Sequence, residues 1–324
     1  VFYLNNDGTV YHGLKTINNQ TYYFGDDNFA YQGFHNIGTK RYFFSYVTSA
    51  LKYGWQNLNG RMFYLHKDGS VKEGWQTIDG GTYYVKDNYI LKWFHKIGTK
   101  EYFFSNVTGA LKQGIQCIDG RYFYLNDDGT VYHGFKTVNQ QTYYFGDDNF
   151  AYQGFHDIGM KRYFFSYVTS ALKYGWQSLN GERFYLYSDG SVKDGFQKIG
   201  NYNYYVNNNY VVKGVREIGG ATYYFDKNLG FLVEGFIQDK NSVYYQDGNG
   251  FFEDGWLEKD SKKYYFSNYK MLKGFNKIGT KTYFLSTVNG QLKTGWQVLN
   301  GNLFYLNDDG TVIDDSWQTI DNKW

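Results

Sequence analysis

The chain repeats itself at fixed intervals, and this periodicity limits its fold more than any other feature. The stretch from Thr21 to His35 recurs unchanged from Thr142 to His156, an offset of 121 residues. Such self-similarity is typical of arrays in which each repeat packs against its neighbours. We therefore expect a single repeat array over residues 1–324 rather than several globular domains.

A shorter period lies within the longer one. Sixteen large apolar residues, usually preceded by glycine, stand 19 to 21 positions apart, and we call them the marker residues. They are Leu14, Phe34, Trp55, Trp75, Phe94, Ile115, Phe135, Phe155, Trp176, Phe196, Val215, Phe236, Trp256, Phe275, Trp296 and Trp317. An aromatic pair or triplet lies between successive markers, so each unit of ~20 residues holds two short runs suited to β-strands.

Turn residues predict that each unit is a β-hairpin. The dipeptides Asn59-Gly60, Asp79-Gly80 and Asn300-Gly301 separate the two runs, and such pairs favour tight hairpin turns. Ile-Gly dipeptides recur every 60 or 61 residues, which indicates three units per turn. Because one hairpin alone is marginal in water, the units must stack. The sequence predicts an all-β solenoid of about sixteen hairpins, forming an elongated rod.

Both ends of the chain fall inside a repeat. Residues 1–4 resemble the second half of a unit, and residues 321–324 stop where an aromatic triplet should begin. We therefore expect this chain to be part of a longer protein, in which a catalytic or toxic domain lies outside these residues.

Charge and composition exclude several classes of partner. There are 33 Lys and Arg against 31 Asp and Glu, so no strong positive field attracts nucleic acid. No run approaches the ~20 apolar residues that a membrane-spanning helix needs. The single cysteine, Cys117, cannot form an internal disulfide. These features predict no nucleic-acid partner and no membrane insertion.

The repeat units carry a family resemblance. The segments from Gly54 to Gly74 and from Gly74 to Lys92 resemble the cell-wall-binding and glucan-binding repeat superfamily. Its members occur in choline-binding surface proteins, in the glucan-binding domains of bacterial glucosyltransferases, and in the receptor-binding repeats of large clostridial toxins. The resemblance implies a β-solenoid, a Gram-positive, secreted or cell wall-associated protein, and recognition of carbohydrate or choline.

Within this superfamily, the residues favour sugar over choline. A quaternary ammonium is held by several aromatic faces, and the choline-binding repeats take a second Trp from the position before the Tyr pair. Here that position holds residues such as Thr21, Arg41, Met62 and Lys263. The run from Gly74 to Gly80 instead resembles glucan-binding and toxin repeats.

A shallow sugar site needs an aromatic platform with hydrogen-bonding neighbours, and we expect both between adjacent hairpins. Packing in the core accounts for most of the aromatic residues. Phe or a smaller residue fills the marker position in ten units, so packing alone does not require Trp there. The candidate carbohydrate-binding residues are Trp55, Gln56, Trp75, Gln76, Trp176, Gln177, Trp256, Trp296, Gln297, Trp317, His35, His95 and His156.

Enzymatic function and metal binding are not expected. The pairs Asp127-Asp128 and Asp308-Asp309 lie in predicted turns, where Asp is favoured for backbone reasons, and they do not fit a calcium loop or a pair of catalytic carboxyls. We expect no cofactor, no metal site and no catalytic residue.

The sequence therefore predicts a non-catalytic, multivalent carbohydrate-binding module for α-glucan, cell-wall polysaccharide or host-cell glycans. Two alternatives stay open. One is a toxin-type repeat region that contacts a protein receptor, for which the divergent segment from Ile237 to Gly250 is the candidate. The other is a passive spacer.

Overall fold

The structure, a computed structural model, describes residues 1–247 and 254–313, and in this part every regular element is a β-strand. Fifteen antiparallel sheets are present in it, each built on one hairpin. The hairpins pair β1 (Gly13–Ile17) with β2 (Gln20–Phe24), β3 (Gly33–Ile37) with β4 (Lys40–Phe44), β5 (Gly54–Leu58) with β6 (Arg61–Leu65), β8 (Gly74–Ile78) with β9 (Gly81–Lys86), β11 (Trp93–Ile97) with β12 (Lys100–Phe104), β13 (Gly114–Ile118) with β14 (Arg121–Leu125), β15 (Gly134–Val138) with β16 (Gln141–Phe145), β17 (Gly154–Ile158) with β18 (Lys161–Phe165), β19 (Gly175–Leu179) with β20 (Glu182–Leu186), β22 (Gly195–Ile199) with β23 (Tyr202–Asn207), β25 (Gly214–Ile218) with β26 (Ala221–Phe225), β27 (Gly235–Asp239) with β28 (Ser242–Gln246), β29 (Gly255–Lys259) with β30 (Lys262–Ser267), β32 (Gly274–Ile278) with β33 (Lys281–Leu285), and β34 (Gly295–Leu299) with β35 (Asn302–Leu306). Five two-residue strands add a third strand to their sheets: β7 (Ser70–Val71), β10 (Tyr89–Ile90), β21 (Ser191–Val192), β24 (Tyr210–Val211) and β31 (Lys270–Met271).

The hairpin turns have the backbone conformation that the sequence predicts. Asn59 and Gly60, between β5 and β6, have φ values of 50° and 81°. Both values lie in the left-handed region, which two-residue hairpin turns of this type require and which Asn and Gly tolerate best. The prediction of an all-β array of hairpins is confirmed, while three hairpins per turn and the rod stay predictions.

Hydrogen bonds of the connecting segments join many of the hairpins to the one before them. Leu51, after β4, forms a bridge with Phe44 of its own hairpin, and its N–H donates to the carbonyl of Thr21 in β2 at 2.7 Å. The same bond recurs from Leu292 to Lys263 at 2.7 Å. Connections of this kind satisfy backbone groups in two consecutive hairpins, which otherwise would present open strand edges.

Aromatic side chains from successive hairpins form the core. Phe123 of β14 is fully buried, with its ring centroid 4.7 Å from that of Phe103 in β12 and 5.1 Å from that of Phe94 in β11. Contacts of this kind bury apolar area that a lone hairpin would leave exposed to water.

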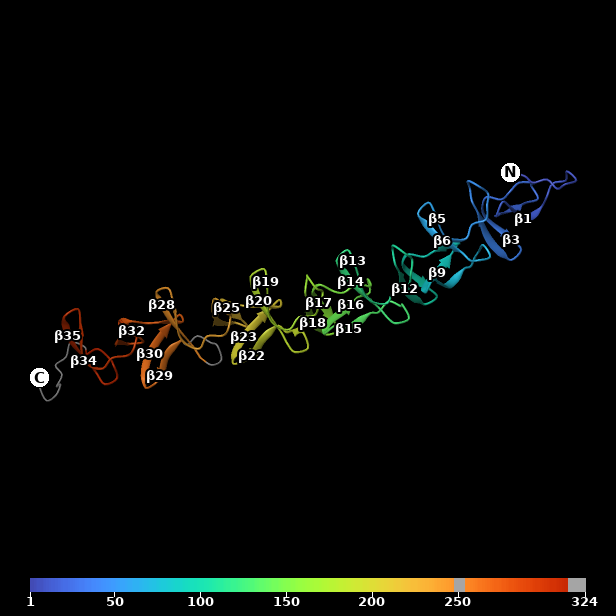
Figure 1. The fold of residues 1–324 in the computed structure, drawn as a ribbon. Coiled ribbons are helices and arrows are strands. Elements are labelled where there is room, and N and C mark those ends of the chain that lie inside the picture. Colours follow the sequence, from blue (N-terminus) through green and yellow to red (C-terminus); the bar gives the residue numbers. More distant parts are fainter. Residues whose placement is uncertain (248–253, 314–324) are drawn as a thin grey trace. The chain divides into compact units, whose positions relative to one another are not determined.

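The chain divides into two compact units, and each is described by itself. The first comprises Val1–His156 with Phe165–Leu172, and the second comprises Asp157–Phe164 with Lys173–Trp324. Within each unit the hairpins follow one another in chain order (Figure 1). Across residues 1–247 and 254–313, no helix has the length and apolar character to cross a membrane.

Replacing a core ring tests this packing. We expect Phe123→Ala to lower the free energy of unfolding by about 3–5 kcal/mol, because it leaves a cavity between two hairpins. Denaturant unfolding followed by circular dichroism measures the loss. Phe123→Leu, which keeps part of the volume, should lose less, and an Ala variant as stable as the wild type would contradict this account of the core.

Candidate carbohydrate-binding grooves

Each Trp marker on a described strand whose neighbouring hairpin is also described packs against two tyrosines. The ring of Trp256 in β29 lies edge-on to Tyr265, its cross-strand partner, at 5.0 Å, and to Tyr283 of the next hairpin at 5.1 Å. The same pair of contacts, at 5.0 to 5.2 Å, surrounds three others: Trp55 (Tyr64 and Tyr83), Trp75 (Tyr84 and Tyr102) and Trp176 (Tyr185 and Tyr204).

The phenylalanine markers Phe196 and Phe236 make the same contacts. Phe196 lies 4.8 Å from Tyr205 and 5.1 Å from Tyr223. Packing of the marker between two tyrosines therefore does not require an indole, so the Trp residues provide surface beyond what stacking needs.

The Trp markers differ in how far they are exposed. Trp75, Trp256 and Trp296 are 41%, 40% and 52% exposed. Trp55 is half-buried, and its indole N–H donates to Asp79 at 3.0 Å. Trp176 is half-buried beneath the guanidinium of Arg183, which lies 4.2 Å from the ring centroid. The first three rings are thus the more accessible platforms.

A groove of about 610 Å³ lies beside Trp256, wholly within the second unit. This volume falls in the range of sites that hold small organic ligands. Its walls come from β29, β30, the following hairpin and two connecting segments. The lining residues are Trp256, Leu257, Glu258, Ser261, Lys262, Lys263, Tyr283, Gln291, Leu292, Thr294, Asp308 and Asp309.

The groove carries both signs of charge beside its aromatic wall. The Lys263 ammonium lies 3.9 Å from the Glu258 carboxylate, and Asp309 is paired with Lys281 at 3.0 Å. Asp308 and Gln291 add a carboxylate and a carboxamide. This arrangement offers donors and acceptors to an uncharged polar ligand without a dominant field of either sign.

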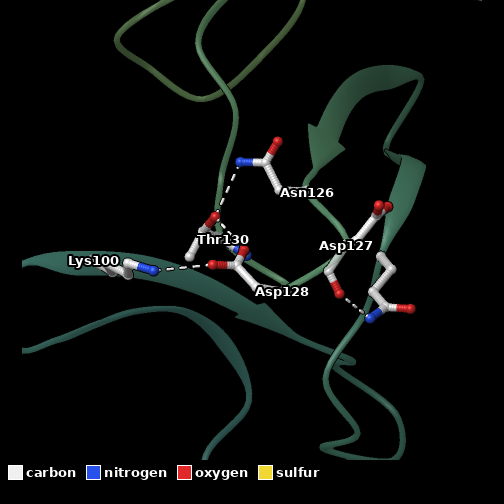
Figure 2. A network of polar contacts seen from close by, with 6 residues as sticks. Lys100, Asn126, Asp127, Asp128 and Thr130 are labelled. Atoms are coloured by element: carbon white, nitrogen blue, oxygen red, sulfur yellow. Dashed lines mark hydrogen bonds and ion pairs between the residues drawn. The ribbon is translucent and has the colours of Figure 1, made fainter.

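The same residue pattern recurs 181 positions earlier, in the first unit. Trp75, Tyr102 and Asp127 correspond to Trp256, Tyr283 and Asp308. Figure 2 shows the polar network at this position: the ammonium of Lys100 bonds Asp128 at 3.0 Å, and Asn126 donates to the hydroxyl of Thr130 at 3.0 Å.

The network holds the connecting segment that follows β14 in place. Asp128 accepts bonds from the backbone N–H and the hydroxyl of Thr130, and Gln113 donates to the carbonyl of Asp127 (Figure 2). These bonds confirm the predicted turn role of the Asp127-Asp128 pair. Equivalent ion pairs join Lys40 to Asp68, Lys161 to Asp189 and Lys281 to Asp309.

Hydrogen bonds lower the pKa of Asp128 to about 2. The Thr130 hydroxyl contributes most, followed by the Thr130 N–H and the Lys100 ammonium. Asp128 is therefore ionised throughout the neutral range, and it in turn raises the pKa of Lys100. Neither group is poised to transfer a proton near neutral pH.

The glutamine candidates have a structural partner. Gln56, Gln177 and Gln297 each donate their amide nitrogen at 2.8 Å to the carbonyl of the residue three positions earlier, and Gln76 does so at 3.1 Å. Side chains of neighbouring strand residues point to opposite faces, so these amides do not share a face with the adjacent Trp. Their role as sugar contacts stays a prediction.

The histidine candidates lie in the same place as the glutamines. The Nε2 atoms of His35, His95 and His156 lie 2.8 to 2.9 Å from the carbonyl of the residue three positions earlier. The rings of His35 and His156 also stack on Tyr31 and Tyr152, each at 3.9 Å. These contacts show a structural role, and sugar contact by the histidines stays a prediction.

Sequence reasoning found Trp256 but missed most of its surroundings. Tyr283, Gln291 and Asp308 come from the next hairpin and from connecting segments, and no local motif marks them as a site. The candidate Trp317 lies outside the described residues. Within residues 1–247 and 254–313, no group of three or more His, Cys, Asp or Glu side chains could hold a metal ion.

The similarity to known proteins includes the repeat units. Five segments match the family model described as a putative cell wall binding repeat: residues 12–28, 73–88, 133–149, 175–192 and 294–311. CbpJ from Streptococcus pneumoniae TIGR4 has a TM-score of 0.58 and 21% identity, over 74% of this chain and 100% of CbpJ. This likeness shows that the two chains share a fold.

Two further solved structures are similar in part. Choline binding protein F from Streptococcus pneumoniae, in the presence of a peptidoglycan analogue, has a TM-score of 0.44 and 19% identity over 93% of this chain and 98% of its own. A pneumococcal cell wall endolysin from phage Cp-1, complexed with choline, has a TM-score of 0.28 and 26% identity over 36% of each chain. No curated protein sequence gives a match.

The polar network predicts how acid affects the fold. The pKa of Asp128 falls to about 2 on folding from an ordinary 3.8, so its ionised form stabilises the folded chain above about pH 4 and this contribution is lost as the pH falls through about 2. We expect Thr130→Val and Lys100→Met each to raise the pKa of Asp128, because each removes a hydrogen bond to the ionised carboxylate. Carboxyl NMR titration measures both, and an unchanged Asp128 pKa in either variant would contradict the contribution of that residue.

Proposed function

We propose that this chain is a non-catalytic, multivalent module that binds a polysaccharide, with the groove beside Trp256 as one of its sites. The observation that carries the proposal is the combination in that groove of an exposed indole with hydrogen-bonding side chains. Sugar rings present C–H groups on their faces and hydroxyls at their edges. Trp256 and Tyr283 offer aromatic surface to the faces, and Glu258, Gln291 and Asp308 offer partners to the hydroxyls.

The lack of a second Trp at this groove favours a neutral ligand over a cationic one. A quaternary ammonium gains most from several aromatic faces with no positive charge nearby. Lys262 and Lys263 line this groove, and Lys263 stands at the position where choline-binding repeats carry a second Trp. Lysine there supplies no aromatic face to a quaternary ammonium, whereas hydroxyl groups can accept its hydrogen bonds.

Repetition supplies affinity that one shallow groove lacks. A polymer that engages one site is held near the others, so the second contact is effectively intramolecular. The recurrence of the Trp, Tyr and Asp pattern at Trp75 and Trp256 provides one such repeated set. The polymer we favour is a cell-wall polysaccharide, because five segments match the cell wall binding repeat. The protein would then be attached to the wall from outside the cell.

Removing one platform tests the proposal. We expect Trp256→Ala to weaken retention on affinity gels about tenfold or less, because the remaining sites still act together. The gels contain purified bacterial cell wall, dextran, another α-glucan or a mammalian glycan conjugate, and the retaining polymer identifies the source. Free choline is added as a competitor in parallel.

Two further variants refine the test. Trp256→Phe should keep the melting temperature, since Phe196 makes the same contacts with two tyrosines, and it should lose less affinity than Ala. Asp308→Asn removes a charged partner of the sugar hydroxyls without touching the ring, and it should also weaken retention. Failure of every polymer to retain the folded wild type would contradict the proposal and favour a spacer or a protein contact, whereas release by choline alone would show that the ligand is cationic.

A further inference from the structure

Trp93 occupies a position that belongs to glycine in the other hairpins. It is the first residue of β11, where β3 has Gly33 and β17 has Gly154, and its φ is 73°. Bulky side chains rarely adopt this left-handed conformation, because Cβ crowds the backbone. The chain thus keeps a strained Trp, 46% exposed, where glycine fits without strain.

A compensating exchange explains how Trp93 is accommodated. A Cβ atom added to Gly33 would lie 2.6 Å from the hydroxyl oxygen of Tyr46, so the Tyr46 ring fills this space in hairpin β3–β4. In hairpin β11–β12 the position of Tyr46 is held by Asn106. The aromatic ring therefore comes from the connecting segment in β3–β4 and from the first residue of the strand in β11–β12.

Both rings cover the same part of their hairpins. Tyr46 lies edge-on to Phe43 at 5.7 Å, and Trp93 lies edge-on to Phe103, the corresponding residue, at 6.3 Å. A third hairpin, β17–β18, repeats the first arrangement, since a Cβ on Gly154 would lie 2.5 Å from the Tyr167 hydroxyl. Tyr46 and Tyr167 are each 56% exposed.

Folding of the hairpin does not require this ring. In β32–β33 the two positions are Gly274 and Thr287, so neither supplies an aromatic side chain. Phe284, the counterpart of Phe103, is nevertheless only 5% exposed. An aromatic ring is thus present at this place in three hairpins, and in one of them it comes from a different position with a strained backbone. Because folding does not need the ring, its presence indicates a role at the surface.

The connecting segments after β4, β12 and β18 begin with uncharged residues. These stretches, residues 45–49, 105–109 and 166–170, contain Ser, Thr, Asn, Tyr, Val and Gly but no charged residue. An exposed ring beside hydroxyl and amide groups suits the C–H face of a neutral sugar. We infer that Tyr46, Trp93 and Tyr167 are a second set of sugar-binding platforms, separate from the groove at Trp256. The choice of a sugar as the ligand rests on the proposed function.

Indole NMR separates this inference from the proposed function. The protein is labelled with ¹⁵N at its Trp side chains, the signals of Trp93 and Trp256 are assigned from Trp93→Phe and Trp256→Phe, and the sample is titrated with isomaltoheptaose and, separately, chitotetraose. We expect one of these sugars to shift both signals.

Each other outcome overturns the Trp93 platform, the Trp256 groove or both. A shift of Trp256 alone overturns the Trp93 platform and leaves the groove, and a shift of Trp93 alone overturns the groove and leaves the platform. Shifts of neither signal with both sugars contradict both.

Moving the ring provides an independent test on the affinity gels. We expect Trp93→Leu, which covers Phe103 without an aromatic face, to weaken retention about tenfold, the change typical of losing one aromatic anchor. The double variant Trp93→Gly, Asn106→Tyr restores the arrangement of β3–β4 and should restore retention, whereas Trp93→Gly alone should not.

Melting temperatures of the same variants separate binding from packing. We expect Trp93→Leu to melt within a few degrees of the wild type. Retention of Trp93→Leu equal to that of the wild type, or loss of retention only in step with loss of melting temperature, would show that the ring is a packing element. A double variant that folds but is not retained would also overturn the inference.

Discussion

The structure depends on the hydrogen bonds by which connecting segments join consecutive hairpins. A two-residue turn closes each hairpin locally, but the hairpin leaves one face and one edge unsatisfied. The N–H of Leu51 bonding Thr21, and that of Leu292 bonding Lys263, fix the distance and register between neighbours. Aromatic rings of successive hairpins then meet at 4.7 to 5.1 Å, as Phe103, Phe94 and Phe123 do, and form a buried cluster.

The same register places the marker ring at the boundary between hairpins. Because a Trp marker such as Trp256 packs against one tyrosine of its own hairpin and one of the next, its outer surface borders the space between them. A connecting segment closes that space on another side and is held by an ion pair such as Lys281 with Asp309. The packing of hairpins on one another and the formation of the groove thus follow from the same arrangement of strands. The choice of Trp, Phe or Leu at the marker position decides how much side-chain surface a ligand can contact.

The repeats, the hairpins and their turns were predictable from the sequence, because they depend on local features: a 20-residue period, aromatic pairs and residues such as Asn59-Gly60 that tolerate positive φ. The composition of the groove was not, since Gln291 and Asp308 come from segments that only the stacking brings beside Trp256. The glutamine and histidine candidates were found from their recurrence in the sequence, which can have another cause. Their recurrence marks a repeated backbone contact, and recurrence alone does not distinguish such a contact from a ligand site. Trp93 carried a visible signal, a Trp in a glycine position, whose meaning depends on the exchange with Asn106.

Saturation-transfer NMR with an oligosaccharide released from the retaining polymer tests the central claim most directly. Aromatic protons of the protein are irradiated, and the transfer of saturation to each sugar proton is measured. If exposed aromatic rings such as Trp256 stack on one face of the sugar, the C–H protons on that face of the sugar should receive the most saturation. Equal transfer to all sugar protons, or none under conditions where the polymer is retained, would contradict recognition through aromatic platforms.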